Sequence, residues 1–275
     1  MTLFKKIIFL LLILAICSCA SETESTSFRI GFSQAMTTDN WRKQMNRSMQ
    51  VEASLHLGLQ LEIKDAQNDV KRQIEQIESF IEQGVDVLIV SPIQSQPITP
   101  VIERAMNSGI PTIVIDRKIE GSNYTSYIGA DNVEIGKNAA NFILSHSNGE
   151  IEVVEITGLE GSSPAYERSE GFTSVIQQND KVKLVSQIRG DWEKASVKNK
   201  LEQKLDSIQT PDFIFAHNDR MALGAWEVAR SRNFEDSIQI IGVDGLFGPN
   251  GGIQLVKEGI LTATILYPTG GGEDI

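Results

Sequence analysis

The chain is poor in the residues that most metal and redox sites require. Its 275 residues include only two cysteines, Cys17 and Cys19, and three histidines, His56, His146 and His217. Two cysteines cannot build a disulfide framework or a cysteine-rich metal site, and the scattered histidines lack the spacing of metal ligands. We therefore predict that the protein has no metal site and uses no cofactor.

Basic residues are also scarce relative to acidic ones. Lys and Arg number 25 against 36 Asp and Glu, which gives a formal net charge of −11 and a sequence pI near 4.9. Nucleic-acid binders gain most of their affinity from Lys and Arg on phosphates, so we expect no nucleic-acid partner. The content of 41% hydrophobic and 22% charged residues excludes disorder for the bulk of the chain.

Residues 1–20 have the pattern of a secretory signal peptide. Two lysines precede the apolar run Ile7–Ile16, which is too short to span about 30 Å of hydrocarbon comfortably. The run ends in Ile16-Cys17-Ser18-Cys19, which resembles the lipobox of bacterial lipoproteins and implies lipidation of Cys19. Residues 21–27 would then form a polar tether. An ordinary cleaved signal, or an uncleaved anchor, is the alternative, and each version places the protein in the periplasm, most simply anchored to a membrane.

Short apolar strands alternate with amphipathic helices from Phe28 onward. The first strand is expected over 28–32, a helix over Trp41–Leu57 and a further strand over 85–90. The strands do not alternate cleanly between apolar and polar residues, which indicates burial on both faces, as in a parallel sheet covered by helices. The pattern restarts near 128–132, and the strands are too many for one compact unit, so we predict two α/β domains.

Polar residues follow the predicted strands in both halves of the chain. Asp116-Arg117, Asn218 and Asp244 each come where a strand ends, and ligands of open parallel sheets bind beyond the carboxyl ends of the strands. Such residues are also common as helix caps and in turns, so no single one of them decides the matter. Their recurrence predicts a cleft between the domains that suits a polyhydroxylated ligand.

Four segments, in order, resemble the ribose-binding and galactose-binding type of periplasmic binding protein, whose core is shared with LacI-type repressors. They are Lys64-Asp-Ala-Gln-Asn-Asp69, Gln83-Gly-Val-Asp-Val-Leu-Ile-Val-Ser-Pro92, Gly109-Ile-Pro-Thr-Ile-Val-Ile-Asp-Arg117 and Ile241-Gly-Val-Asp-Gly245. The resemblance implies the type 1 periplasmic-binding fold, with two Rossmann-like three-layer α/β domains joined by crossover strands. Residues 28–129 and 262–275 would form the N-terminal lobe and residues 130–261 the C-terminal lobe.

The same resemblance implies roles for individual residues. Asp116 and Arg117 would hold ring hydroxyls from the first lobe, while Arg168, ahead of Gly171-Phe172, would act from the second lobe with Asn218 and Asp244. Trp41 would stack on the sugar, with core packing as its alternative role. Tyr267 falls where the family often has glutamine, which implies an altered ligand preference or a shifted contact.

These features predict an exported, non-enzymatic carbohydrate-binding protein that captures a monosaccharide or small sugar by hinge closure for an ABC permease. The alternative is the extracytoplasmic sugar-sensing domain of a membrane receptor such as a hybrid two-component histidine kinase. The lipobox favours the transporter, and Trp41-Arg-Lys favours the sensor. A repressor needs an N-terminal helix-turn-helix, and an export signal occupies that place.

An enzyme is disfavoured because no Ser/His/Asp or Cys/His set can be assembled. His217 is the only histidine near the expected cleft, where a structural role lining the cleft is favoured over that of a general base. The family continues past Gly270 with another helix and crossing strand, so we expect the sequence to be truncated at its C-terminus.

Overall fold

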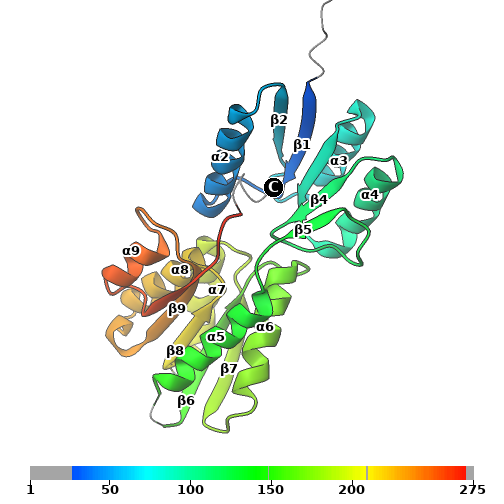
Figure 1. The fold of residues 1–275 in the computed structure, drawn as a ribbon. Helices are drawn as coiled ribbons and strands as arrows, with labels where there is room; N and C mark the ends of the chain where they lie inside the picture. Colours follow the sequence, from blue (N-terminus) through cyan, green and yellow to red (C-terminus); the bar gives the residue numbers. More distant parts are fainter. Residues whose placement is uncertain (1–26, 148, 209, 271–275) are drawn as a thin grey trace, which may run out of the picture.

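The structure is a computed structural model that describes residues 27–147, 149–208 and 210–270. The predicted signal peptide, the lipidation at Cys19 and nearly all of the tether lie outside these residues. The described chain forms two lobes, each built on a five-stranded parallel sheet (Figure 1). This architecture confirms the predicted pair of three-layer α/β domains. None of the described helices has both the length and the apolar character needed to cross a bilayer.

The first lobe contains the sheet β2-β1-β3-β4-β5. Its strands are β1 (Phe28–Gln34), β2 (Leu59–Asp65), β3 (Val87–Ser91), β4 (Thr112–Ile115) and β5 (Ser126–Ile128), and its helices are α2 (Asn40–Leu55), α3 (Val70–Gln83) and α4 (Ser95–Asn107). Successive residues of β3 pack on opposite faces of the sheet. Ile89 belongs to the hydrophobic cluster that includes α2, whereas Leu88 belongs to the cluster that includes α3 and α4. Helices therefore cover both faces, as the unbroken apolar strands predicted.

The second lobe contains the sheet β10-β9-β8-β6-β7. Its strands are β6 (Ile151–Thr157), β7 (Val182–Arg189), β8 (Phe213–Ala216), β9 (Gln239–Asp244) and β10 (Ala263–Leu266). Its helices are α5 (Asn132–Ser145), α6 (Ser163–Ile176), α7 (Lys194–Leu205), α8 (Asp219–Ser231) and α9 (Gly252–Lys257), with the 3-10 turn η2 (Glu235–Ser237). The chain enters this lobe directly after β5 (Figure 1).

Two glycines let α5 and α6 pack with their backbones almost in contact. A Cβ at Gly136 would lie 2.1 Å from the carbonyl oxygen of Arg168, and a Cβ at Gly171 would lie 1.9 Å from that of Val133. Neither distance is tolerable for a side chain, so both positions need glycine. This close packing fixes the backbone of Arg168 on α6 against α5.

The expected placement of residues 262–275 in the first lobe is wrong for β10. This strand pairs in parallel with β9 of the second sheet, with Thr264 opposite Gly242. The amide of Thr262 donates to the carbonyl of Ile240 at 2.8 Å, which starts the ladder. Because the edge of β9 accepts β10 in this way, the chain turns toward the first lobe only after Leu266, where β10 ends (Figure 1). The carbonyl of the next residue, Tyr267, accepts a hydrogen bond from Trp41 of the first lobe.

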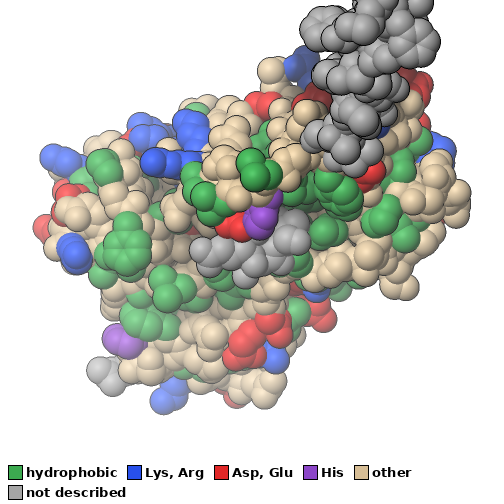
Figure 2. All heavy atoms as spheres, turned by 45° about the horizontal axis from the view of Figure 1, so that its top comes forward, with side chains coloured by type: hydrophobic (Ala, Val, Ile, Leu, Met, Phe, Trp, Pro, Cys, Tyr) green, Lys and Arg blue, Asp and Glu red, His purple; other side chains and the backbone are tan. Residues whose placement is uncertain are grey.

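The surface carries charges of both signs. On the face shown in Figure 2, acidic and basic side chains both occur, with apolar side chains between them. This distribution agrees with an acidic surplus that is spread over solvated helices rather than gathered at a binding site for one charged partner.

Candidate functional site

A cavity of about 540 Å³ lies between the lobes, at the carboxyl ends of the strands. All seven residues predicted for the site line it: Trp41, Asp116, Arg117 and Tyr267 together with Arg168, Asn218 and Asp244. The structure therefore brings them together in one place. Their contact with a ligand stays a prediction.

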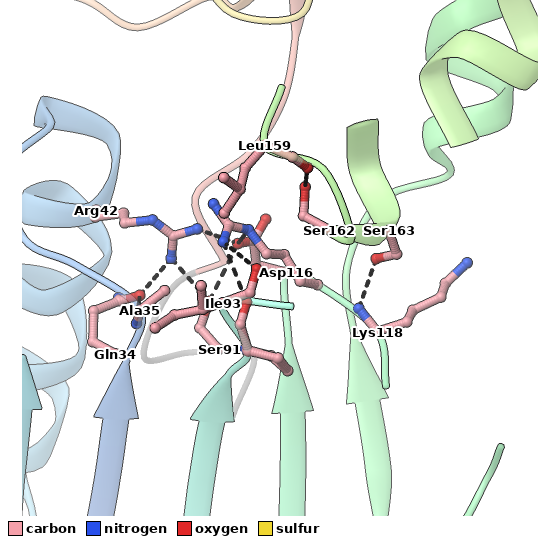
Figure 3. Close-up of polar contacts among 12 residues, drawn as sticks. Gln34, Ala35, Arg42, Ser91, Ile93, Asp116, Lys118, Leu159, Ser162 and Ser163 are labelled. Atoms are coloured by element: carbon pink, nitrogen blue, oxygen red, sulfur yellow. Dashed lines mark hydrogen bonds and ion pairs between the residues drawn. The ribbon is translucent and has the colours of Figure 1, made fainter. Parts of the chain in front are cut away.

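The first-lobe wall is organised around a buried ion pair (Figure 3). Arg42, 3% exposed, donates from Nη2 to Oδ2 of Asp116 at 2.7 Å, and Asp116 is 6% exposed. The other nitrogen, Nη1, donates to the hydroxyl of Ser91 at 2.8 Å and to the side-chain oxygen of Gln34. A buried pair is tolerated when its remaining donors and acceptors are also satisfied, which is the case here.

The charges in this wall shift each other's ionisation. Burial alone would raise the pKa of Asp116, but Arg42 and Arg117 outweigh burial and hold that pKa below its ordinary value. Burial would likewise lower the pKa of Arg42, but Asp116 and Asp39 raise it overall. For Arg117, burial and the nearby Arg42 prevail and lower the pKa to about 9. All three groups are therefore charged at neutral pH.

Two arginines from different lobes flank one tryptophan, Trp192. The guanidinium of Arg117 lies 5.6 Å from the indole centre and that of Arg168 lies 5.7 Å from it. Trp192 is buried, and its backbone adopts a φ of 65°, which is uncommon for a bulky residue. A Cβ at Gly158 would lie 2.0 Å from the indole, so this glycine makes room for the ring.

The guanidinium of each cleft arginine is held by hydrogen bonds. Arg117 donates from Nη1 to the carbonyl of Ile93 at 2.9 Å. Arg168 donates from Nε to the side-chain oxygen of Asn132 at 2.9 Å and from Nη1 to the carbonyl of His217. Bonds of this kind fix the planar fork before a ligand arrives, which lowers the entropy lost on binding.

Trp41 packs against Tyr267 from the crossover. Their rings are 5.2 Å apart with an interplanar angle of 24°, and the indole nitrogen of Trp41 donates to the carbonyl of Tyr267 at 3.0 Å. Trp41 also belongs to the core cluster that contains Met45 and Phe32. Its indole therefore combines core packing with a position at the edge of the cavity.

The second-lobe wall presents carboxyl groups in a different setting. Asn218 accepts the amide of Met221 at 2.8 Å and so caps α8, which leaves its side-chain nitrogen as a donor for a ligand. Burial raises the pKa of Asp219 to about 6, even though Thr264 and the amide of Gly245 donate to it. Burial and the neighbouring Asp219 raise the pKa of Asp244 well above its ordinary value.

His217 lies behind this wall and is fully buried. Its Nε2 donates to Oε1 of Glu155 at 2.9 Å. The hydrogen bonds that Glu155 accepts outweigh its burial and hold its pKa below the ordinary value, so this carboxylate acts only as an acceptor. Burial lowers the pKa of His217 more than Glu155 raises it, so the imidazole is neutral. His217 is absent from the residues that line the cavity, so the expectation that it lines the cleft is wrong, and its contacts are those of a buried side chain behind the wall.

Among the further residues that line the cavity, sequence reasoning missed Arg42, whereas it expected Trp192 and Asp219 only as members of the set that follows the strands, with no role of their own. A signal for Arg42 was present, because it lies on the helix face of the buried residues Met45 and Met49, where a charge needs a buried partner. Trp192 lies in the loop after β7, which ends at Arg189, whereas Asp116 follows β4 directly. Asp219 stands directly after the helix cap Asn218 and reads locally as an ordinary first-turn acid.

The two lobes also touch at one side of the cavity. The amide of Lys118 donates to the hydroxyl of Ser163 at 2.8 Å (Figure 3), and the amide of Ser95 donates to the carbonyl of Gly161 at 2.9 Å. The ammonium of Lys118 pairs with Glu167 at 2.7 Å. These contacts join loops at the carboxyl ends of β3 and β4 to the start of α6.

Comparisons with known proteins agree with this architecture. A family model described as periplasmic binding protein domain matches residues 30–271. The ribose import binding protein of Bacillus subtilis (strain 168) is 32% identical over 238 residues, which cover 86% of this chain and 75% of the relative. The galactofuranose-binding protein of Escherichia coli (strain K12) is 29% identical over 226 residues, with 79% and 71% covered.

Solved structures extend the comparison. The fructose-binding periplasmic domain of a hybrid two-component system is 40% identical, with a TM-score of 0.87 and coverage of 90% of this chain and 82% of that one. The binding protein of the arabinose ABC transporter from Shewanella sp. ANA-3 is 29% identical, with a TM-score of 0.82 and coverage of 88% and 81%. These relatives are binding proteins, in agreement with the prediction that the chain is not an enzyme.

Proposed function

The chain belongs to the periplasmic binding protein domain family, and from that premise we propose that it captures a monosaccharide between its lobes by hinge closure and delivers it to an ABC permease. The observation that carries this proposal is the composition of the 540 Å³ cavity. Charged and amide groups from both lobes converge there beside aromatic rings, which is the combination that recognises hydroxyl groups and the C–H face of a sugar.

The division of the site between lobes supports hinge closure. Asp116 and Arg117 belong to the first lobe, whereas Arg168, Asn218 and Asp244 belong to the second. A ligand that contacts both sets binds the closed arrangement more tightly than the open one, and only such a difference in affinity can shift the population.

The relatives also support a sugar with a five-membered ring. Solved relatives are described as bound to arabinofuranose and to fucofuranose, at 29% and 31% identity, and another as a galactofuranose-binding protein at 28% identity. For this chain we propose a pentose or ketohexose in its furanose form. Carboxyl and guanidinium groups on both sides of the cavity suit a sugar ring whose hydroxyls point to opposite faces.

The test is thermal unfolding and calorimetry of the mature chain with a panel of pentoses, aldohexoses and ketohexoses. A ligand that binds only the folded state at a hundred times its Kd adds about 2.7 kcal/mol to the free energy of unfolding. Arg168→Gln should abolish the shift, while Arg104→Gln, in an exposed pair with Glu78, should leave it intact. A panel that produces neither shift nor heat contradicts the proposal.

A second candidate function is sugar sensing for a membrane receptor. It is favoured by the 40% identity to the periplasmic domain of a hybrid two-component system. The coding sequence beyond Ile275 separates the candidates. A transmembrane segment followed by a kinase supports the sensor, and a stop codon after a short further segment supports the free binding protein.

A further inference from the structure

Tyr267 joins residues from both lobes through one side chain. The ring is 4% exposed and stacks on Trp41 of the first lobe, and the guanidinium of Arg168 from the second lobe lies 4.5 Å from its centre. Its hydroxyl donates to Oδ1 of Asp116 at 2.8 Å. Tyr267 thus occupies the crossover end of the cavity and is held there on three sides.

The hydrogen bond from Tyr267 limits what Asp116 can offer. A carboxylate has about four acceptor positions, two on each oxygen. Oδ2 of Asp116 accepts from Arg42 at 2.7 Å and from Ser91 at 3.2 Å, and Oδ1 accepts from Tyr267. One position on Oδ1 is left for a ligand hydroxyl, and its direction is fixed by the Tyr267 bond.

Trp41, Asp116 and Tyr267 also form a wall between two cavities. Besides the 540 Å³ cavity, the three residues line a second one of about 180 Å³ on the crossover side. That second space is lined mainly by apolar or small residues: Met45, Ile115, Ile128, Gly129, Ala130, Pro268, Thr269 and Gly270. A sugar hydroxyl placed there would lose its hydration with few partners to replace it.

We propose that Tyr267 is a specificity-determining residue that restricts the site to an unsubstituted monosaccharide on the crossover side. Its ring closes the path into the second cavity, and its hydroxyl aims the remaining acceptor of Asp116 at one ligand hydroxyl. A sugar that carries a methyl group or a second sugar at that hydroxyl is excluded by both effects. This inference rests on the proposed function, because it presumes that a sugar occupies the larger cavity.

The test uses the mature chain, its best monosaccharide ligand and the complete set of mono-O-methyl derivatives of that sugar. Wild type should reject at least one derivative. Tyr267→Ala should improve the affinity for this derivative relative to the parent sugar by tenfold or more, because the wall is gone. Tyr267→Phe keeps the ring, so it should not rescue the derivative. It should weaken the parent sugar about tenfold, since one hydrogen bond to a charged acceptor is lost.

Tyr127→Phe is the matched control. The hydroxyl of Tyr127 also donates to Asp116, at 2.9 Å, but to the main-chain oxygen and not to the carboxylate. It lines neither cavity, so this variant should keep the selectivity of wild type. An equal change in the Tyr127→Phe and Tyr267→Phe proteins would contradict the proposal.

The stacking of Tyr267 on Trp41 can be tested without a ligand. In a background with Trp192 and Trp226 replaced by Phe, Tyr267→Ala should shift the emission of Trp41 to longer wavelength, because the stacked ring no longer shields the indole. If wild type binds a sugar and Tyr267→Ala leaves the ratio of affinities unchanged, the inference fails and the proposed function stands. If wild type binds no sugar, the proposed function fails and this inference with it, whatever the emission does.

Discussion

Asp116 and Asp244 occupy similar places in the two lobes but have opposite electrostatic surroundings. Asp116 follows β4 and Asp244 ends β9, both have positive φ angles, of 63° and 128°, and both line the same cavity. Burial by itself raises the pKa of each carboxyl group. In the first lobe, the positive charges of Arg42 and Arg117 outweigh burial and lower the pKa of Asp116. For Asp244, the neighbouring Asp219 adds to the effect of burial, and Arg168 offsets it only in part.

Because their surroundings differ, the carboxyl groups of Asp116 and Asp244 have different roles in the cavity wall. The carboxylate of Asp116 is committed to Arg42, Ser91 and Tyr267, so it belongs to a wall that is assembled before the ligand arrives. The carboxyl of Asp244 stands beside a second acid, so its charge is costly until a donor approaches. Ligand hydroxyls therefore find in the first lobe an acceptor that protein donors already fix, and in the second lobe a carboxyl group whose charge is stabilised when a ligand donor approaches.

The largest effect is expected from removing the first-lobe acid. Asp116→Ala leaves the buried guanidiniums of Arg42 and Arg117 without their counter-ion, which should cost about 3–5 kcal/mol of folding stability. Urea unfolding of the ligand-free chain measures this loss. Asp116→Asn keeps an acceptor for Arg42 but not the charge, so its loss should be smaller. If Asp116→Ala unfolds at the same urea concentration as wild type, the ion pair does not stabilise the first lobe.

The same substitution in the second lobe should act in the opposite direction. Asp244→Asn removes one of two neighbouring acids, so it should raise stability near neutral pH by about 1 kcal/mol, the size of one solvent-screened charge repulsion. Affinity should fall about tenfold to a hundredfold, because a charged acceptor is lost. A loss of stability as large as that of Asp116→Ala would remove the contrast between the lobes.

The pH dependence of stability sharpens this comparison. The pKa of Asp219 is raised to about 6, so the folded chain binds more protons than the unfolded chain above the ordinary pKa of an aspartate. The contribution of this group to stability is therefore present at low pH and is lost as the pH rises through about 6. Asp244→Asn should remove the further loss that Asp244 adds at higher pH, because burial and the neighbouring Asp219 raise the pKa of Asp244 well above its ordinary value. The measurement is the free energy of unfolding of wild type and variant across pH 4.5–7.5.

A smaller effect is expected from the aromatic residue of the first lobe. Trp41→Phe keeps a ring against Tyr267 but removes the hydrogen bond to its carbonyl, which should cost about 1 kcal/mol. If Trp41 contacts the sugar, this variant should also lose most of the fluorescence change on ligand addition. Trp226→Phe serves as the control for residual tryptophan signal. If the fluorescence change on ligand addition is intact in Trp41→Phe, it comes from Trp192, which lies near Arg117 and Arg168.

The smallest effect is expected at the contact between the lobes. The side chain of Lys118 is 41% exposed, and its pair with Glu167 is therefore screened by solvent. Lys118→Ala should change affinity and stability by no more than about 1 kcal/mol, because the amide that donates to Ser163 is retained. Calorimetry at low and high salt checks this. A large, salt-sensitive loss of affinity would show that this ion pair, and not the cavity, governs closure.

The partners of the last strand show where prediction from sequence stopped. The segment Ala263–Leu266 forms a strand, as its apolar and β-branched residues favour. Its placement in the first lobe was wrong, since any apolar strand can pair with either exposed sheet edge. The contacts of Thr262 and Thr264 with β9 and Asp219, which decide the pairing, come from residues about twenty or more positions away.

The sequence by itself determined the order of strands and helices and the polar residues that follow the strands, among them Asp116, Asn218 and Asp244. These features depend on hydrophobic periodicity and on local chain turns, which neighbouring residues encode. Only the tertiary structure decided which acid is paired and which is repelled. Arg42 reaches Asp116 across 74 positions and Tyr267 reaches it across 151. Electrostatic energy depends on distances in space and on burial, and neither can be read from separations along the chain.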